Sequence, residues 1–146
     1  MRNMLCLQQY EYDFAVDAGA AGAFNLHAKN NKAVIPVGAI ITNVTAKVVT
    51  AVTADGSATL TWGNGDDGDG YCTHGSPIAV ATFADNYVTN AASLDSALLF
   101  DGTNDHMIPY AVTTAAQGQL ILTVATANIT AGKILFFVEY IYPTES

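Results

Sequence analysis

Acidic side chains are concentrated in one glycine-rich stretch, residues 63–75 (GNGDDGDGYCTHG), which contains Asp66, Asp67 and Asp69. Closely spaced carboxylates suggest calcium, which takes oxygen ligands. The ligand order of an EF-hand is not met, because Gly68 and Asp69 stand where a ligand and the glycine belong, and no glutamate follows at the required distance. We therefore expect a solvated acidic loop, and calcium binding in this loop stays open as the alternative.

Three histidines, His27, His74 and His106, are candidates for catalysis or metal binding. None has a second metal ligand at the spacing of a strand or a helix. A serine–histidine–aspartate triad could be assembled only from Ser93, His106 and Asp105. No Gly-x-Ser-x-Gly turn presents the serine, and adjacent Asp and His side chains point apart in a strand. A hydrolase is therefore the weakest functional hypothesis.

Other catalytic arrangements also lack support. A glycosidase needs a pair of carboxylates, but Glu11, Glu139 and Glu145 are accounted for by expected strand surfaces and by the end of the chain. Gly63 and Gly65 do not stand between a strand and a helix, where a phosphate-binding loop would lie. The sequence predicts a protein that is not an enzyme and that holds no metal and no cofactor.

The composition and net charge of the chain argue against some classes of binding partner. Of 146 residues, 12% are charged, about half the ~25% of an average domain, and 51% are apolar. The formal net charge is −8 and the five strong cations are scattered, so we expect neither nucleic acid nor an anionic membrane surface as a partner. No apolar run reaches the ~20 residues of a spanning helix, and no signal peptide is recognised. Cys6 and Cys72 are expected to be free thiols.

Apolar and polar residues alternate with a period of two, which predicts strands. The pattern is clearest in residues 118–142, where two apolar runs joined by a short Asn/Thr/Gly linker predict a β-hairpin. Residues 40–62, turning at Asp55-Gly56, predict a second hairpin, and residues 10–28 predict a third. The middle of the chain loses the alternation; we expect a helical turn at 77–81 and short strands at 98–100 and 108–112.

These elements predict an all-β fold in which two antiparallel sheets pack as a β-sandwich, with a long irregular middle loop region. Residues 1–9 read as an N-terminal docking arm, and residues 10–146 as a single β-sandwich domain. Residues 134–142 are apolar on both faces of their strand, so they need cover on each side. We expect self-association or binding to a larger partner, with a monomer that has a Thr-rich sheet face as the alternative.

Three stretches in this order, FAVDAGAAGAFNL, IPVGAIITNVTAKVVTAVTADGSATLTWG and LTVATANITAGKILFFVEYIY, resemble small structural proteins of tailed bacteriophages. The resemblance covers both flanks of the chain, and the middle, Gly63 to Tyr110, departs from it. The matching residues are Pro36, Gly38 to Ile41, Leu122 to Ala127, Thr130 to Lys133 and Val138 to Tyr140.

The resemblance implies a β-sandwich or jelly-roll head protein that decorates or cements the outside of a phage capsid by bridging neighbouring capsomers. It implies the major capsid protein as the partner, a homotrimer as the oligomer, and a place on the virion exterior after synthesis in the host cytoplasm. We add candidate assembly contacts from the arm and from aromatic positions: Met4, Leu5, Leu7, Tyr10, Trp62 and Tyr71.

A receptor- or glycan-binding module of a head fibre or tail is the alternative function. It is motivated by Trp62, Tyr71 and Tyr87, which are expected in or beside long loops, where aromatic rings can stack on a ligand. Trp62 is also expected in the core, on the inward face of its strand with Ala58 and Leu60. The alternative therefore depends on whether these rings reach the surface.

Overall fold

The computed structural model describes residues 3–27, 34–72, 78–90 and 109–143. Almost all regular structure in these residues is β-strand, with one short α-helix and a few short 3-10 turns. The elements, in chain order, are β1 (Asn3–Asp13), α1 (Phe14–Asp17), β2 (Gly22–Asn25), β3 (Ile40–Ala54), β4 (Thr59–Gly63), β5 (Ile78–Ala79), η3 (Val80–Thr82), β6 (Val88–Asn90), β7 (Tyr110–Ala111), η5 (Ala116–Gly118), β8 (Ile121–Ala125) and β9 (Ile129–Pro143).

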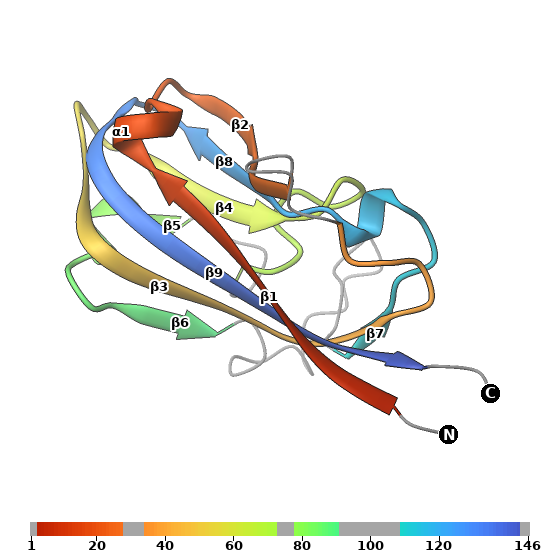
Figure 1. The fold of residues 1–146 in the computed structure, drawn as a ribbon. Coiled ribbons are helices and arrows are strands. Elements are labelled where there is room, and N and C mark those ends of the chain that lie inside the picture. The colour runs from red at the N-terminus through yellow and green to blue at the C-terminus, as the bar shows by residue number, and fades with distance from the viewer. Residues whose placement is uncertain (1–2, 28–33, 73–77, 91–108, 144–146) are drawn as a thin grey trace.

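The strands form two antiparallel sheets that pack face to face (Figure 1). The five-stranded sheet has the order β1-β9-β3-β6, with β7 also paired to β3. The four-stranded sheet has the order β2-β8-β4-β5. The prediction of an all-β, two-sheet antiparallel sandwich is confirmed.

Strand alternation places the core between the sheets. In β9, Ile134, Phe136 and Val138 are buried, and in β4, Leu60 and Trp62 face them from the other sheet. The Trp62 ring meets Phe136 edge to face, with ring centroids 5.7 Å apart, which joins the two layers by an aromatic contact. The inward face predicted for β4 is confirmed.

A β-bulge changes the face of one expected core residue. The sequence places Ile40 on the inner face of β3 with Val44 and Val48, because the three positions share a parity. The pairing of β3 with β9 shifts between Ile41 and Asn43, so Ile41 is fully buried and Ile40 is only half-buried. The extra residue of a bulge exchanges the inward and outward positions of the strand on one side of it. The alternation of apolar and polar residues in the sequence does not reveal this exchange.

The predicted hairpins are wrong in their pairing. β3 and β4 belong to different sheets, and so do β8 and β9; β3 pairs with β9, and β4 pairs with β8. The turns at residues 55–58 and 126–128 therefore carry the chain from one sheet to the other (Figure 1). Each turn makes a corner of the sandwich, and the long strands find partners far away in the sequence.

The N-terminal hairpin is also corrected. β1 pairs with β9 in one sheet, and β2 pairs with β8 in the other, because the short helix α1 turns the chain between the layers. In the middle of the chain, the expected helical turn is present only as the 3-10 turn η3, which begins at Val80, and β5 occupies the two residues before it. The predicted strand at 98–100 lies outside the described residues.

Candidate functional site

The described part of the acidic loop is held by hydrogen bonds to the side chain and the backbone of Asn64. Asn64 Oδ1 accepts hydrogen bonds from the amides of Asp66 (2.9 Å) and Asp67 (3.0 Å), and the Asn64 amide donates to the Asp67 carbonyl (2.7 Å). Such Asx turns define a loop without an ion. Within residues 3–27, 34–72, 78–90 and 109–143, no group of three His, Cys, Asp or Glu side chains could hold a metal ion.

The catalytic candidates are not brought together in the described residues. His27 Nδ1 lies 3.2 Å from the Leu120 carbonyl oxygen, which occupies that side of the ring. Glu11 and Glu139 project from β1 and β9. Ser93, Asp105 and His106, together with His74 and Glu145, lie outside the described residues.

One groove, of about 440 Å³, lies beside the turn between β3 and β4. It is lined by small and apolar residues, among them Val52, Ser57 and Val80, and none of its lining residues is titratable. General acid–base chemistry needs a titratable side chain within reach of the substrate. This groove therefore gives the hydrolase hypothesis no support.

Three of the candidate assembly contacts lie in the core. Tyr10, Trp62 and Tyr71 are each only 1% exposed. Tyr71 Oη donates a 3.4 Å hydrogen bond to the Gln117 carbonyl, and burial raises the pKa of the Tyr10 phenol far above its ordinary value. A ring with so little exposed surface can neither stack on a sugar nor contact a partner unless the core opens.

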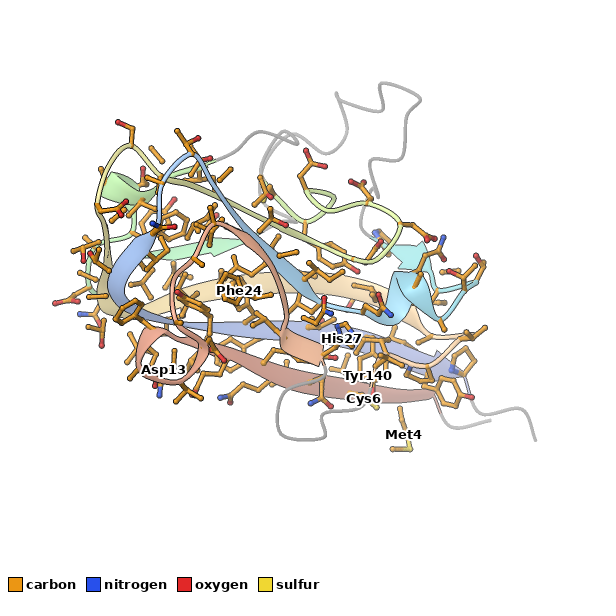
Figure 2. All side chains as sticks on the ribbon, turned by 90° about the horizontal axis from the view of Figure 1, so that it is seen from above. Met4, Cys6, Asp13, Phe24, His27 and Tyr140 are labelled. Carbon is orange, nitrogen blue, oxygen red and sulfur yellow. The ribbon has the colours of Figure 1, made fainter. Side chains whose placement is uncertain are left out.

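The other three candidates lie together near the start of β1 and are exposed. Met4, Leu5 and Leu7 are 57%, 68% and 65% exposed. This part of β1 pairs with the end of β9, and the two strands run on together past the four-stranded sheet (Figure 1). Figure 2 shows Met4 at the periphery of the molecule and Cys6 near Tyr140. We call residues 3–9 the exposed edge of β1.

The exposed edge has no layer over it because the second sheet ends before it. Leu5 and Leu7 have the opposite parity to the buried Tyr10 and Tyr12, so they lie on the outer face of the sheet, and Met4 lies on the inner face. Apolar side chains are thus exposed on both faces of the same strand. The role of residues 1–9 as a docking arm stays a prediction.

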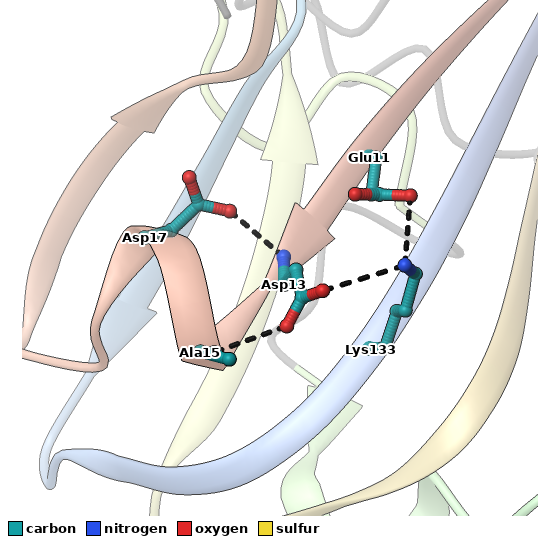
Figure 3. A network of polar contacts seen from close by, with 5 residues as sticks. All are labelled: Glu11, Asp13, Ala15, Asp17 and Lys133. Atoms are coloured by element: carbon teal, nitrogen blue, oxygen red, sulfur yellow. Dashed lines mark hydrogen bonds and ion pairs between the residues drawn. The ribbon is translucent and has the colours of Figure 1, made fainter.

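The other end of β1 is fixed by charged groups (Figure 3). Lys133 Nζ lies 3.0 Å from Glu11 Oε2 and 3.3 Å from Asp13 Oδ2. These hydrogen bonds hold the pKa of Lys133 above its ordinary value. Asp13 Oδ1 also accepts from the Ala15 amide (3.0 Å), and the Asp13 amide donates to Asp17 Oδ2 (2.7 Å), so Asp13 caps the first turn of α1.

Both cysteines are free, as predicted. Cys72 is buried, and its Sγ accepts from the Trp62 amide at 3.0 Å. Burial raises the pKa of the Cys72 thiol to about 12. Cys6 is partly exposed on β1 opposite Tyr140, and burial, followed by the nearby Cys6, raises the pKa of the Tyr140 phenol.

No helix in the described parts of the chain is long and apolar enough to span a bilayer. Comparison with protein-family models finds no match, and comparison with curated proteins finds no relative.

Comparison with solved structures finds chains of phage capsids. A chain in the capsid asymmetric unit of cyanophage Pam1 is 18% identical, covers 97% of this chain and 86% of its own length, and superposes with a TM-score of 0.63. A chain in the acid-stable capsid of Helicobacter pylori bacteriophage KHP30 is 19% identical over 98% of this chain and 94% of that one, with a TM-score of 0.48. A chain in the capsid of Ralstonia phage GP4 is 12% identical over 97% and 86%, also with a TM-score of 0.48. At 18% identity the likeness to the Pam1 chain is a likeness of fold.

Proposed function

We propose that this chain is a virion structural protein that decorates the outer surface of a phage capsid and cements it by bridging neighbouring capsomers. The observation that carries the proposal is the likeness of fold, over 97% of the chain, to a chain in a cyanophage capsid. The resemblance of both flanks of the sequence to phage head structural proteins supports it independently of the fold.

The surface chemistry agrees with this role. Only 12% of the residues are charged, and the exposed apolar side chains of β1 lie where a neighbouring chain could cover them. Cement acts through many symmetric, individually weak contacts, whose combined avidity exceeds that of any single contact. The proposed partners are the major capsid protein and further copies of this chain, in a homotrimer.

The net charge of −8 agrees with the outside of the shell. Packaged DNA fills the interior of a capsid, and a chain without a cluster of cations offers its phosphates no binding surface. We therefore place the chain on the exterior of the shell. We assign it a structural role without enzymatic activity.

Removal of the chain from the particle tests the proposal. Particles that lack it should assemble and then lose their DNA at a lower temperature, and after a milder osmotic shock, than complete particles. Addition of the purified chain should restore the resistance. If particles without the chain are as resistant as complete ones, the cementing role is wrong.

The glycan-binding alternative receives no support from the described residues. Its motive was aromatic rings at loops, but Trp62 and Tyr71 are buried, and Tyr87 packs against Phe83 with ring centroids 5.7 Å apart. Copy number separates the two functions, because a receptor-binding module of a fibre or tail would be present in far fewer copies than the major capsid protein.

A further inference from the structure

Strand β1 differs from every other edge strand in the described residues. The remaining edges of the two sheets are formed by strands of two to four residues, namely β2, β5, β6 and β7. β1 has eleven residues and, in the described parts of the chain, pairs only with β9. Short edge strands are one of the ways in which β-proteins avoid pairing with other chains, and β1 lacks this protection.

The first part of β1 lacks the other protections as well. Residues 3–9 (NMLCLQQ) contain no charge, no proline and no glycine. Leu5 and Leu7 are exposed on one face and Met4 on the other. Further along the same strand, Glu11 and Asp13 pair with Lys133, so charge appears only where the exposed edge has ended. A long, neutral, apolar edge is a site for the addition of another strand.

We propose that the exposed edge of β1 pairs antiparallel with the exposed edge of a second copy of this chain, about a two-fold axis. The two five-stranded sheets would then continue into each other. The proposal goes beyond the proposed function and does not require it. The two-fold contact is distinct from the three-fold contacts of the proposed homotrimer, and it forms between two copies in the absence of a capsid.

Charge restricts where two copies can meet and sets the direction of the strands. Two copies carry −8 each and repel one another over most of their surfaces, so a neutral segment is where they can approach. In a parallel arrangement the Glu11 and Asp13 carboxylates of the two copies would lie close together. In an antiparallel pair about a two-fold axis they lie at opposite ends of the contact, and only neutral residues face each other.

The neutral segment also fixes the register. Residues 3–9 are centred on Cys6, so the register that pairs the whole segment with itself places Cys6 opposite Cys6 of the second copy. Leu5 then lies opposite Leu7 of the second copy, and this pair occurs twice. A register shifted by two residues would place Leu7 opposite Leu7 and would bring Asn3 opposite Glu11, at the charged end of the strand.

The register can be tested with two double variants in which the same positions carry different charges. Leu5→Lys with Leu7→Lys places lysine opposite lysine at both pairs, and the dissociation constant measured by sedimentation equilibrium should rise at least tenfold. Leu5→Glu with Leu7→Lys places glutamate opposite lysine at both pairs, and the dissociation constant should stay within threefold of wild type. The lysine that Leu7→Lys introduces would also face Glu139 on β9 of its own chain, so the fold is not strained.

A matched control separates the contact from general charge effects. Val16→Lys with Val49→Lys adds the same two charges at exposed positions on α1 and β3, away from the edge. Its dissociation constant should stay within threefold of wild type. Circular dichroism and thermal unfolding establish that all three variants are folded before association is measured.

A short bis-maleimide linker gives a second readout of the same geometry. Because Cys6 is partly exposed and Cys72 is buried, the linker should join two wild-type copies through Cys6. Cross-linking should persist in Cys72→Ser and should be lost in Cys6→Ser and in the double-lysine variant.

The proposal is overturned if the wild-type chain stays monomeric up to the highest concentration reached. It is equally overturned if the double-lysine variant associates as wild type does, or if the glutamate–lysine variant is as weak as the double-lysine variant. None of these results bears on whether the chain coats a capsid, since the particle experiments measure that separately.

Discussion

Asp55 and Asn128 lie 73 residues apart in the sequence and are joined by three hydrogen bonds. The Asn128 amide donates to Asp55 Oδ1 at 2.9 Å, Asn128 Nδ2 donates to Asp55 Oδ2 at 3.1 Å, and the Asp55 amide donates to the Asn128 carbonyl at 3.0 Å. Each residue belongs to one of the two turns that cross between the sheets. The pair therefore holds together the corner of the sandwich where β3 passes to β4 and β8 passes to β9.

Replacement of Asn128 by alanine should lower the free energy of unfolding by about 1–2 kcal/mol, since it removes the side-chain bond from Nδ2 to Asp55 and Oδ1 as acceptor for the Ala21 amide. The variants Asn128→Ala and Asp55→Ala share one lost bond, from Asn128 Nδ2 to Asp55 Oδ2. A double-mutant cycle of Asn128→Ala and Asp55→Ala, followed by chemical denaturation, should give a coupling energy of about 1 kcal/mol. Strict additivity would show that the two corners are stabilised independently.

The sequence predicted most strands and their inward faces, but not which strands pair. Apolar and polar residues alternate along these strands, and the apolar face of each strand must be buried. Leu122, Val124 and Trp62 therefore lie in the core. A turn such as Asp55-Gly56 is equally compatible with a hairpin and with a crossing between two sheets. The choice depends on the partners available to β3 and β9, two strands of fifteen residues from distant parts of the chain, and no local pattern encodes that pairing.

Gly132 should not tolerate a side chain. Its φ is +132°, and a Cβ at this position would lie 2.8 Å from the Val52 Cα, where the register of β9 against β3 shifts. Gly132→Ala should lower the free energy of unfolding by about 2–4 kcal/mol, measured by denaturant titration. Gly22→Ala is the matched control, because Gly22 has a φ of +146° but no atom near the added Cβ; it should cost only about 1 kcal/mol. Equal losses of stability in the two variants would mean that the positive φ, and not the contact with Val52, sets the cost of the substitution.

Stability should fall in alkali through Cys72. Burial raises its thiol pKa from 9.0 to about 12 in the folded chain, so below pH 9 both the folded and the unfolded chain hold the proton and stability is complete. As pH rises from 9 towards 12, the unfolded chain releases the proton first, and unfolding becomes easier. By pH 10 the loss should be about 1.4 kcal/mol. Denaturation of Cys72→Ala over pH 8 to 10 should show a smaller decrease; an identical decrease would assign it to another group.

The charged end of β1 should be stabilised more by capping than by ion pairing. Asp13→Ala removes the N-cap of α1 and should cost about 1 kcal/mol. Lys133→Met removes two partly exposed ion pairs and should cost less than Asp13→Ala. The effect of Lys133→Met should vanish at about 1 M salt, where the screening length is about 3 Å, whereas that of Asp13→Ala should remain. A salt-independent loss in Lys133→Met would show that the lysine stem acts by packing.

The candidate assembly contacts fall into two groups, those on the exposed edge of β1 and those in the core. Apolar residues in an N-terminal arm need a partner, which predicts a contact role for Met4, Leu5 and Leu7, and the structure exposes all three. Tyr71 lies within the acidic loop in the sequence, which predicts a surface position for its ring, whereas Trp62 directly precedes the loop and the alternation of its strand already predicts the core. The loop folds back on itself, so that the Tyr71 amide donates to the Trp62 carbonyl at 3.1 Å and both rings lie in the core. That return is a tertiary contact and leaves no periodic signal.

The position and number of copies of this chain in the particle test the central claim most directly. An electron cryomicroscopy map of the particles should place the chain on the outer surface of the shell, in a fixed whole-number ratio to the major capsid protein and across the boundaries between capsomers. A chain found inside the shell, or only in a few copies at a tail or fibre, would contradict the account.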